Sequence, residues 1–249
     1  MWFWKMRPGK FTSLCCAWFG AYLMMAAPAF GGPPYLSDDP QPTDYGHFEI
    51  YAFAQGTRTD AGTAGATGID FNYGGAPNLQ LTAVLPLAYD ETGHTGLGNV
   101  ELAAKYKFLH QEDIGWDIAV FPRVFLPSLS SLGDDHAAFM LPLWAQKDIG
   151  KWSMFGGGGC VLNQGGTSRD FCFQGWAVTR EVAEGLRLGA EIFHQGADEM
   201  GGRVSTVLGG GLTYDLDEHH HLLAWYGPAL ENAAATGHDN WYTSLLFTF

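Results

Sequence analysis

Basic residues are scarce in this chain of 249 residues, which holds 13 Lys and Arg against 26 Asp and Glu. The formal net charge at pH 7 is −13. Nucleic acids bind to surfaces that neutralise their phosphates, so the acidic composition excludes nucleic acid as a partner.

A high mean hydropathy is also missing, since the value for the chain is −0.04. This value excludes a membrane protein built of many apolar helices. It leaves a transmembrane β-barrel open, because the strands of such a barrel alternate apolar and polar residues. Charged residues make up only 16% of the chain, whereas aromatic residues make up 14% and glycine numbers 34. This mixture favours many short strands joined by tight turns.

The N-terminus has the features of a secretory signal peptide. Three basic residues among the first ten precede an uncharged run over residues 11–30, and Ala27 and Ala29 place small residues where a signal peptidase cuts. We expect a signal peptide over residues 1–29, whose removal leaves 13 − 3 = 10 basic residues against 26 acidic ones. A retained anchor helix is the alternative, and the Gly-Gly-Pro-Pro stretch that follows disfavours it.

Residues 30–46 contain several prolines and three aspartates and show no periodicity. We expect this stretch to form an extended periplasmic lead-in. A barrel domain over residues 47–249 follows it.

Apolar and polar residues alternate in the rest of the chain over segments of roughly nine to eleven residues, the length of a tilted membrane strand. The clearest segment covers residues 78–88, where leucines alternate with Gln80 and Thr82. Twelve such segments are predicted: 47–55, 67–73, 78–88, 99–109, 116–126, 138–146, 152–162, 171–179, 186–195, 204–214, 221–229 and 241–249.

The connections between these segments fall into two alternating classes. Six are long and rich in Gly, Asp, Ser and Thr, beginning with residues 56–66, and the five between them are short. Long outer loops alternating with short inner turns are typical of outer-membrane barrels, whereas a soluble Greek-key sandwich has no such alternation. We predict an all-β fold, a transmembrane antiparallel up-and-down β-barrel of about 12 strands in the bacterial outer membrane.

The last predicted strand ends on an aromatic residue. Phe247 and Phe249 share one face of it with Trp241, and this face is suited to lipid. A terminal Phe in this register resembles the assembly signal of bacterial outer-membrane proteins. The expected partners are therefore outer-membrane lipid and the barrel-assembly machinery.

Longer stretches resemble one family. They are DFNYGGAPNLQLTAVLPLAY (70–89), GLGNVELAAKYKFL (96–109), FPRVFLPS (121–128), LPLWAQKDIGKWS (141–153) and WAVTREVAEGLRLGAEIFHQ (176–195). These stretches are similar to the phenol-degradation meta-pathway outer-membrane family, whose members are commonly described as transporters. The resemblance implies a barrel and a transport role, and it supplies no catalytic or ligand residues.

Polar residues on the inward faces of the predicted strands are the candidates for lining the lumen. The functional interpretation is a polar passage or binding cavity, and the alternative is a salt-bridged interior that only holds the barrel together. The candidates are Glu49, Asp70, Asn72, Gln80, Thr82, Glu101, Lys105, Lys107, Asp117, Arg123, Arg187 and Glu191.

Four cysteines occur, and two of them lie in the predicted signal peptide. Cys160 and Cys172 flank the loop over residues 163–170 almost symmetrically. A hairpin would bring them together as a disulfide, whereas a register slip of one residue would send them to opposite faces.

Two other kinds of site are weaker candidates. Residues 128–136 combine serines, aspartates and a histidine in one outer loop, but no nucleophile elbow accompanies them. His219, His220 and His221 are adjacent, so along a strand they cannot all point to one metal ion. We predict no enzyme, no metal site and no other cofactor.

These observations lead to three hypotheses for function. The first is a channel or facilitator for small solutes, with aromatic or hydrophobic solutes as the class that the barrel would pass. The second is a barrel that serves in the envelope without transport, and the third is a barrel enzyme.

Overall fold

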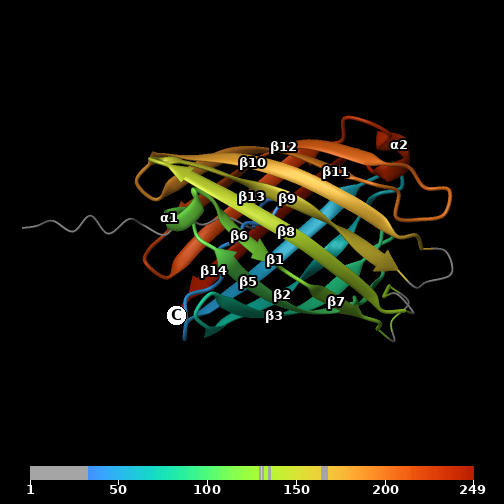
Figure 1. Ribbon diagram of the computed structural model, residues 1–249. Helices are drawn as coiled ribbons and strands as arrows, with labels where there is room; N and C mark the ends of the chain where they lie inside the picture. Colours follow the sequence, from blue (N-terminus) through green and yellow to red (C-terminus); the bar gives the residue numbers. More distant parts are fainter. Residues whose placement is uncertain (1–32, 129, 131, 134–135, 164–167) are drawn as a thin grey trace, which may run out of the picture.

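The computed structural model describes residues 33–249 except 129, 131, 134–135 and 164–167. The predicted signal peptide, residues 1–29, lies outside the described residues. The described chain forms one antiparallel sheet that curls into a closed barrel (Figure 1).

Fourteen strands and two short helices occur in the described residues. Two pairs of strands, β4 with β5 and β6 with β7, are consecutive parts of one interrupted strand each, so the barrel wall has 14 − 2 = 12 strands. The elements are β1 (Phe48–Arg58), β2 (Thr63–Ala76), β3 (Leu79–Tyr89), β4 (Thr95–Leu97), β5 (Val100–Leu109), α1 (Gln111–Ile114), β6 (Asp117–Val120), β7 (Arg123–Leu126), β8 (Ala138–Ile149), β9 (Trp152–Asn163), β10 (Phe171–Ala183), β11 (Leu186–Gln195), β12 (Ser205–Asp215), β13 (His220–Pro228), α2 (Ala233–Thr236) and β14 (Asp239–Thr248).

Each wall strand pairs with the next one along the chain, and β1 pairs with β14 to close the barrel. The seam runs from Glu49 opposite Thr248 to Arg58 opposite Asp239. We call the end where β1 begins and β14 stops the inner end, and the opposite end the outer end. In Figure 1, α1 lies at the inner end and α2 at the outer end. The predicted up-and-down barrel of about 12 strands is confirmed.

The wall is apolar outside, whereas its inward face carries polar side chains together with two clusters of buried apolar ones around Trp144 and Leu246. On β3, the outward Leu81, Leu85 and Leu87 are 46%, 57% and 48% exposed, whereas the inward Gln80 and Thr82 are 6% and 7% exposed. Large apolar side chains cover the exterior in the same way on the other strands. Such a continuous apolar exterior is stable in lipid and not in water.

Aromatic residues lie on the exterior near the inner end. Phe48 stacks on Tyr73 at 4.7 Å between ring centroids, and the Arg180 guanidinium lies 5.0 Å from the Trp152 ring. Aromatic rings at this level are typical of the boundary between hydrocarbon and headgroups. Within the described residues, no helix has the length and apolar character needed to span a membrane.

Two predicted boundaries are wrong. The predicted outer loop over residues 56–66 is mostly strand, since β1 and β2 stay paired up to Arg58 opposite Thr63 and only a tight turn remains. Gly, Ala and Thr occupy both strands here, so the apolar alternation disappears although the backbone pairing continues. The predicted strand over residues 116–126 is interrupted at Phe121 and Pro122, because proline has no N–H for the ladder.

The lead-in prediction also needs correction. Residues 33–44, which we call the lumen segment, do not extend into the periplasm. They lie inside the barrel, where Ser37 and Asp39 are 0% exposed, and run toward the inner end before the chain turns into β1. The physical reason is that the polar groups of the segment find partners on the inner wall, so burial leaves few of them unpaired.

Candidate functional site

The lumen segment is held first by a single buried carboxylate. Glu191 on β11 is 1% exposed, and its two oxygens accept hydrogen bonds from the backbone N–H groups of Leu36 at 3.0 Å and Ser37 at 2.5 Å. Hydrogen bonds to a charged acceptor are stronger than neutral ones. Glu191 therefore fixes the position of the segment within the lumen.

Glycines on the facing strands make room for this segment. A Cβ atom on Gly211 would lie 2.9 Å from the Tyr35 ring, and Cβ atoms on Gly175 and Gly189 would collide with the side chains of Ser37 and Tyr35. Any larger residue at these positions would push the segment away from the wall. The inward glycines of β10 to β12 thus form a shallow bed for it.

A buried ionic cluster holds the middle of the segment. Asp38 accepts hydrogen bonds from Lys105 at 2.9 Å and Arg123 at 2.7 Å, and Arg123 also contacts Glu101 at 3.3 Å. The Phe121 ring lies 4.9 Å from the Lys105 ammonium and 4.1 Å from the Arg123 guanidinium. Both cations are therefore occupied by the chain's own groups.

Neutral and charged hydrogen bonds hold the rest of the segment near the inner end. Gln41 donates to Asp117 at 2.8 Å and accepts from Lys107 at 2.7 Å. Thr43 donates its backbone N–H to Gln80 at 2.9 Å. The segment is thus bound by polar contacts along most of its length, with Tyr35 against Phe155 as its main aromatic contact at 5.6 Å.

The adjacent Asp38 and Asp39 of the segment have pKa values shifted in opposite directions. Although burial opposes ionisation, Lys105 and Arg123 hold the pKa of Asp38 below its usual range. Burial raises the pKa of Asp39 to about 7, and the neighbouring Asp38 adds to the rise. In agreement with this, Oδ2 of Asp39 is buried and finds no hydrogen-bond partner in the described part of the chain.

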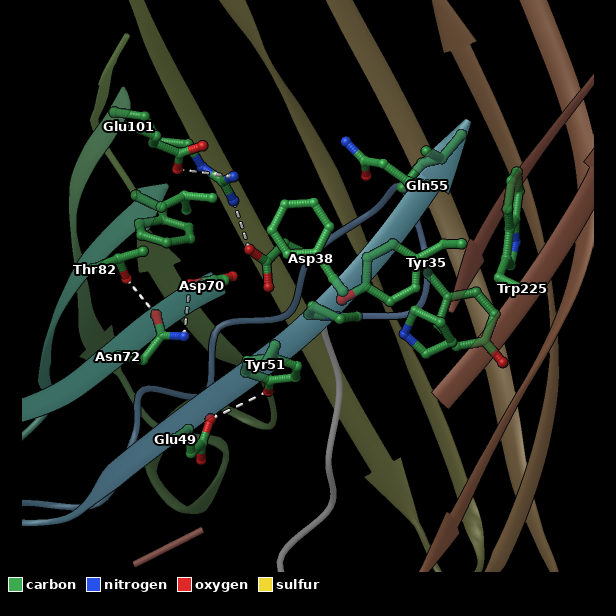
Figure 2. A pocket seen from close by; sticks show the side chains of 18 of the residues that line it. Tyr35, Asp38, Glu49, Tyr51, Gln55, Asp70, Asn72, Thr82, Glu101 and Trp225 are labelled. Carbon is green, nitrogen blue, oxygen red and sulfur yellow. Dashed lines mark hydrogen bonds and ion pairs between the residues drawn. The ribbon is translucent and has the colours of Figure 1, made fainter. Parts of the chain in front are cut away.

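A cavity of about 450 Å³ remains between the lumen segment and the opposite wall. It extends from Asp38 to Thr57 and Asn240, which lie near the outer end of β1 and β14. Figure 2 shows Glu49, Asp70 and Glu101 on one side of it, with Asp38 and Tyr35 of the segment nearby.

The cavity has an acidic part and an aromatic part. In the acidic part, Asn72 donates to Asp70 at 2.9 Å and accepts from Thr82 at 2.5 Å, so it fixes the Asp70 carboxylate. The aromatic part is formed by Tyr51, Phe53, Trp225 and Tyr242. Phe53 and Tyr242 are stacked with their ring centroids 6.3 Å apart.

The structure places the predicted lumen residues in three groups. Lys107, Asp117 and Glu191 bind the lumen segment, and Arg187 shares the inward face of β11 with Glu191 without lining the cavity. Eight line the cavity: Glu49, Asp70, Asn72, Gln80, Thr82, Glu101, Lys105 and Arg123.

Sequence reasoning missed the lumen segment and the aromatic part of the cavity. Tyr51 and Phe53 alternate with outward residues on β1, so strict alternation would have placed them inside. The position of the segment had no comparable signal, because its composition is that of a linker.

Other predicted features lie away from the cavity. Cys160 and Cys172 are directly opposite in the β9–β10 pairing and are joined by a disulfide on the outward face. Phe247 lies opposite Ile50 in the seam, and Phe249 exchanges two backbone hydrogen bonds of 3.0 Å with Phe48. The assembly role of the two phenylalanines remains a prediction.

The weaker candidates are only partly described by the structure. The hydroxyl of Ser128 donates to the backbone carbonyl of Leu97 at 2.7 Å, and part of its loop lies outside the described residues. His220 contacts Asp217 and His221 contacts Asp215, in two separate pairs. No group of three metal-ligating side chains is found in the described ranges.

Solved structures with similar folds are outer-membrane barrels. An outer membrane channel from Pseudomonas putida F1 has a TM-score of 0.67 at 15% identity, covering 85% of this chain and 98% of that one. The KdgM porin, solved in complex with disordered oligogalacturonate, has a TM-score of 0.56 at 10% identity, covering 82% and 99%. The beta domain of the Bordetella autotransporter BrkA has a TM-score of 0.51 at 14% identity, covering 82% and 99%. These likenesses show the fold.

Curated protein sequences gave no match to this chain. A family model, in contrast, covers almost all of the barrel and most of the lumen segment. It is described as "Putative MetA-pathway of phenol degradation" and matches residues 36–247, so the chain belongs to this family.

Proposed function

We propose that the protein is an outer-membrane channel for small solutes, and that solutes pass when the lumen segment moves aside. The observation that carries this proposal is the cavity of about 450 Å³, which extends toward the outer end and is bounded by the segment. The similar folds of an outer membrane channel and a porin support it. No enzymatic role is proposed.

The way in which the segment is bound makes its release feasible. Hydrogen bonds and ion pairs attach it to Glu191, Lys105, Arg123 and Gln80. Water or a polar solute can replace each of these polar contacts. Its removal would leave the closed strand ladder of β1 to β14 intact, because the wall pairing does not include residues 33–44. The wall can thus persist while the lumen opens.

The size and lining of the cavity favour compact solutes with an aromatic ring. A cavity of about 450 Å³ has the volume of a typical small-molecule site. Aromatic side chains such as Tyr51 and Trp225 offer faces and edges for stacking with a ring. Larger solutes would require the segment to leave first.

Conductance in planar bilayers tests the channel. We expect small, intermittent conductance from the parent protein and larger, sustained conductance from a variant that lacks residues 33–44 behind an intact signal sequence. A solute-flux assay in liposomes should rank the two proteins in the same order.

The deletion variant must first be shown to form the barrel, by its changed gel mobility without heating. If the folded deletion variant neither conducts ions nor passes solutes, the interior is closed for another reason. The alternative of a non-transporting envelope barrel would then replace the channel.

A further inference from the structure

Acidic side chains outnumber basic ones in the lining of the cavity. Four carboxylates and two cations line it, a difference of 4 − 2 = 2, and both cations are engaged by Asp38. Arg123 also contacts Glu101. Among the described residues, Glu49 and Asp70 form no ion pair with Lys or Arg within 4.0 Å.

Asp70 is the better placed of these two carboxylates for binding a solute. It lies opposite Tyr51 in the β1–β2 pairing and opposite Val84 in the β2–β3 pairing. Val84 in turn lies opposite Glu101 on β5. Asp70 and Glu101 therefore lie at the same level of the barrel wall, with only β3 between their strands. Asn72 donates to one oxygen of Asp70 and fixes its direction.

The aromatic part of the cavity borders this acid. Tyr51 is 6% exposed, and Phe53 and Tyr242 stack above it toward the outer end. Trp225 is 3% exposed and lines the cavity, and its indole N–H has no hydrogen-bond partner in the described part of the chain.

The acidic and aromatic parts of the cavity together favour a cationic solute over a neutral or an anionic one. A cation beside an aromatic face is attracted by the ring, and its hydrogen bond to a carboxylate is stronger than that of a neutral donor. A neutral alcohol of the same shape would keep the ring stacking, but it would lose both the attraction of a cation to the ring and the stronger hydrogen bond to the carboxylate. An anion would face the uncompensated acids, since Asp38 already occupies Lys105 and Arg123.

We propose that the lumen cavity binds small organic cations, in particular a primary ammonium carried on an aromatic ring, with Asp70 as the anionic anchor and Tyr51, Tyr242 and Trp225 as the aromatic wall. This inference deepens the proposed channel function by naming its solute class. The ammonium lies between Asp70 and Glu49, and the ring lies toward the outer end.

Three probes with the same phenyl ring test the charge preference: benzylammonium, benzyl alcohol and benzoate. Calorimetric titration of the purified full chain should show benzylammonium binding at least about tenfold tighter than benzyl alcohol, equal to about 1.4 kcal/mol. Benzoate should bind most weakly. The Asp70→Asn variant should lose most of the preference for benzylammonium, whereas Glu184→Gln, which changes an exposed acid outside the cavity, should keep it.

Glu49→Gln is the second cavity variant, used if Asp70→Asn does not show the gel mobility of a folded barrel. Equal binding of the ammonium and the alcohol would overturn the inference, as would a preference that survives in the folded cavity variant. Absence of binding by all three probes would also overturn it.

Liposome flux of the same probes separates this inference from the proposed function. Selective binding without flux would keep the cation site and contradict the channel. Flux without charge preference would keep the channel and contradict the cation site.

Discussion

Two lysines of this chain form ion pairs of equal length in different surroundings. Lys105 and Asp38 are 2.9 Å apart with side chains 5% and 11% exposed, whereas Lys151 and Glu181 are 2.9 Å apart with side chains 62% and 35% exposed. Removing one partner of a buried pair leaves the other charge buried and costs about 3–5 kcal/mol. An exposed pair contributes about 0–1 kcal/mol.

We therefore expect Lys105→Met to lower the free energy of unfolding by about 3 kcal/mol, the lower part of that range, because Arg123 still contacts Asp38. Lys151→Met should change it by less than about 1 kcal/mol. Urea unfolding in lipid vesicles, followed by tryptophan fluorescence, measures both. Equal losses in the two variants would show that the Lys105 pair is as hydrated as the surface pair.

Asp39 gives the lumen a dependence on pH. Its pKa in the folded chain is raised to about 7 from an ordinary value of 3.8, first by burial. Between pH 4 and pH 7 the folded state therefore binds more protons than the unfolded state at this group, so its contribution to stability falls as pH rises. The effect of Asp38, whose pKa is shifted downward, has the opposite sign.

The expected outcome is a change of slope in the Asp39→Asn variant. Over pH 4 to 7, the free energy of unfolding of this variant should decline less with rising pH than that of the parent. Unfolding curves at three pH values provide the comparison. Parallel pH dependences in the two proteins would mean that Asp39 is ionised in the folded state.

At the scale of the element, the fit between the lumen segment and β12 can be tested at neighbouring residues. A Cβ on Gly211 would lie 2.9 Å from the Tyr35 ring, whereas a Cβ on Gly210 would meet its nearest atom at 3.6 Å. We expect Gly211→Ala to displace Tyr35 and destabilise the protein by about 1–3 kcal/mol. Gly210→Ala, on the opposite face of the same strand, is the matched control.

Conductance should report the displaced segment. The Gly211→Ala variant should conduct more in planar bilayers than the parent, and Gly210→Ala should conduct like the parent. If both variants behave alike, the β12 wall does not hold the segment in place.

The strands were predictable because one physical pattern repeats in each of them. Gln80 and Thr82 alternate with exposed leucines, and this alternation alone assigns them to the lumen. The pattern failed between Gly56 and Gly65, where small residues occupy both faces. Pairing there depends on backbone hydrogen bonds, which composition does not reveal.

The lumen segment could not be placed from its own residues. Prolines and aspartates are typical of an extended linker, and burial of Asp38 becomes favourable only because Lys105 and Arg123 lie close by. Lys105 and Arg123 are far from Asp38 in the sequence, and the alternation of the strands assigned them to the lumen without identifying the residue that they bind. Pairing between an irregular segment and a barrel wall has no sequence period. The sequence therefore predicted the wall residues of the candidate site and not the segment that binds them.

At the scale of the whole molecule, closure depends on the β1–β14 seam. Phe249 and Phe48 exchange two backbone hydrogen bonds of 3.0 Å at its inner end. We expect deletion of Phe249 to reduce the yield of folded protein in the outer membrane, because the seam loses these bonds and the terminal aromatic is removed. Fractionation and gel mobility with and without heating measure the effect. Replacement by Tyr should restore folding, and an unchanged yield after the deletion would refute the role of this residue.

The position of Asp38 on the chain has a consequence for selectivity. It lies 48 − 38 = 10 residues before β1, so it is a ligand that the barrel carries on a short tether. Such a tether gives an effective concentration on the order of millimolar. A free carboxylate supplied at micromolar concentration, with the same intrinsic affinity for Lys105 and Arg123, is then outcompeted by roughly a thousandfold. Dilute anions are thus kept off these two cations by simple mass action.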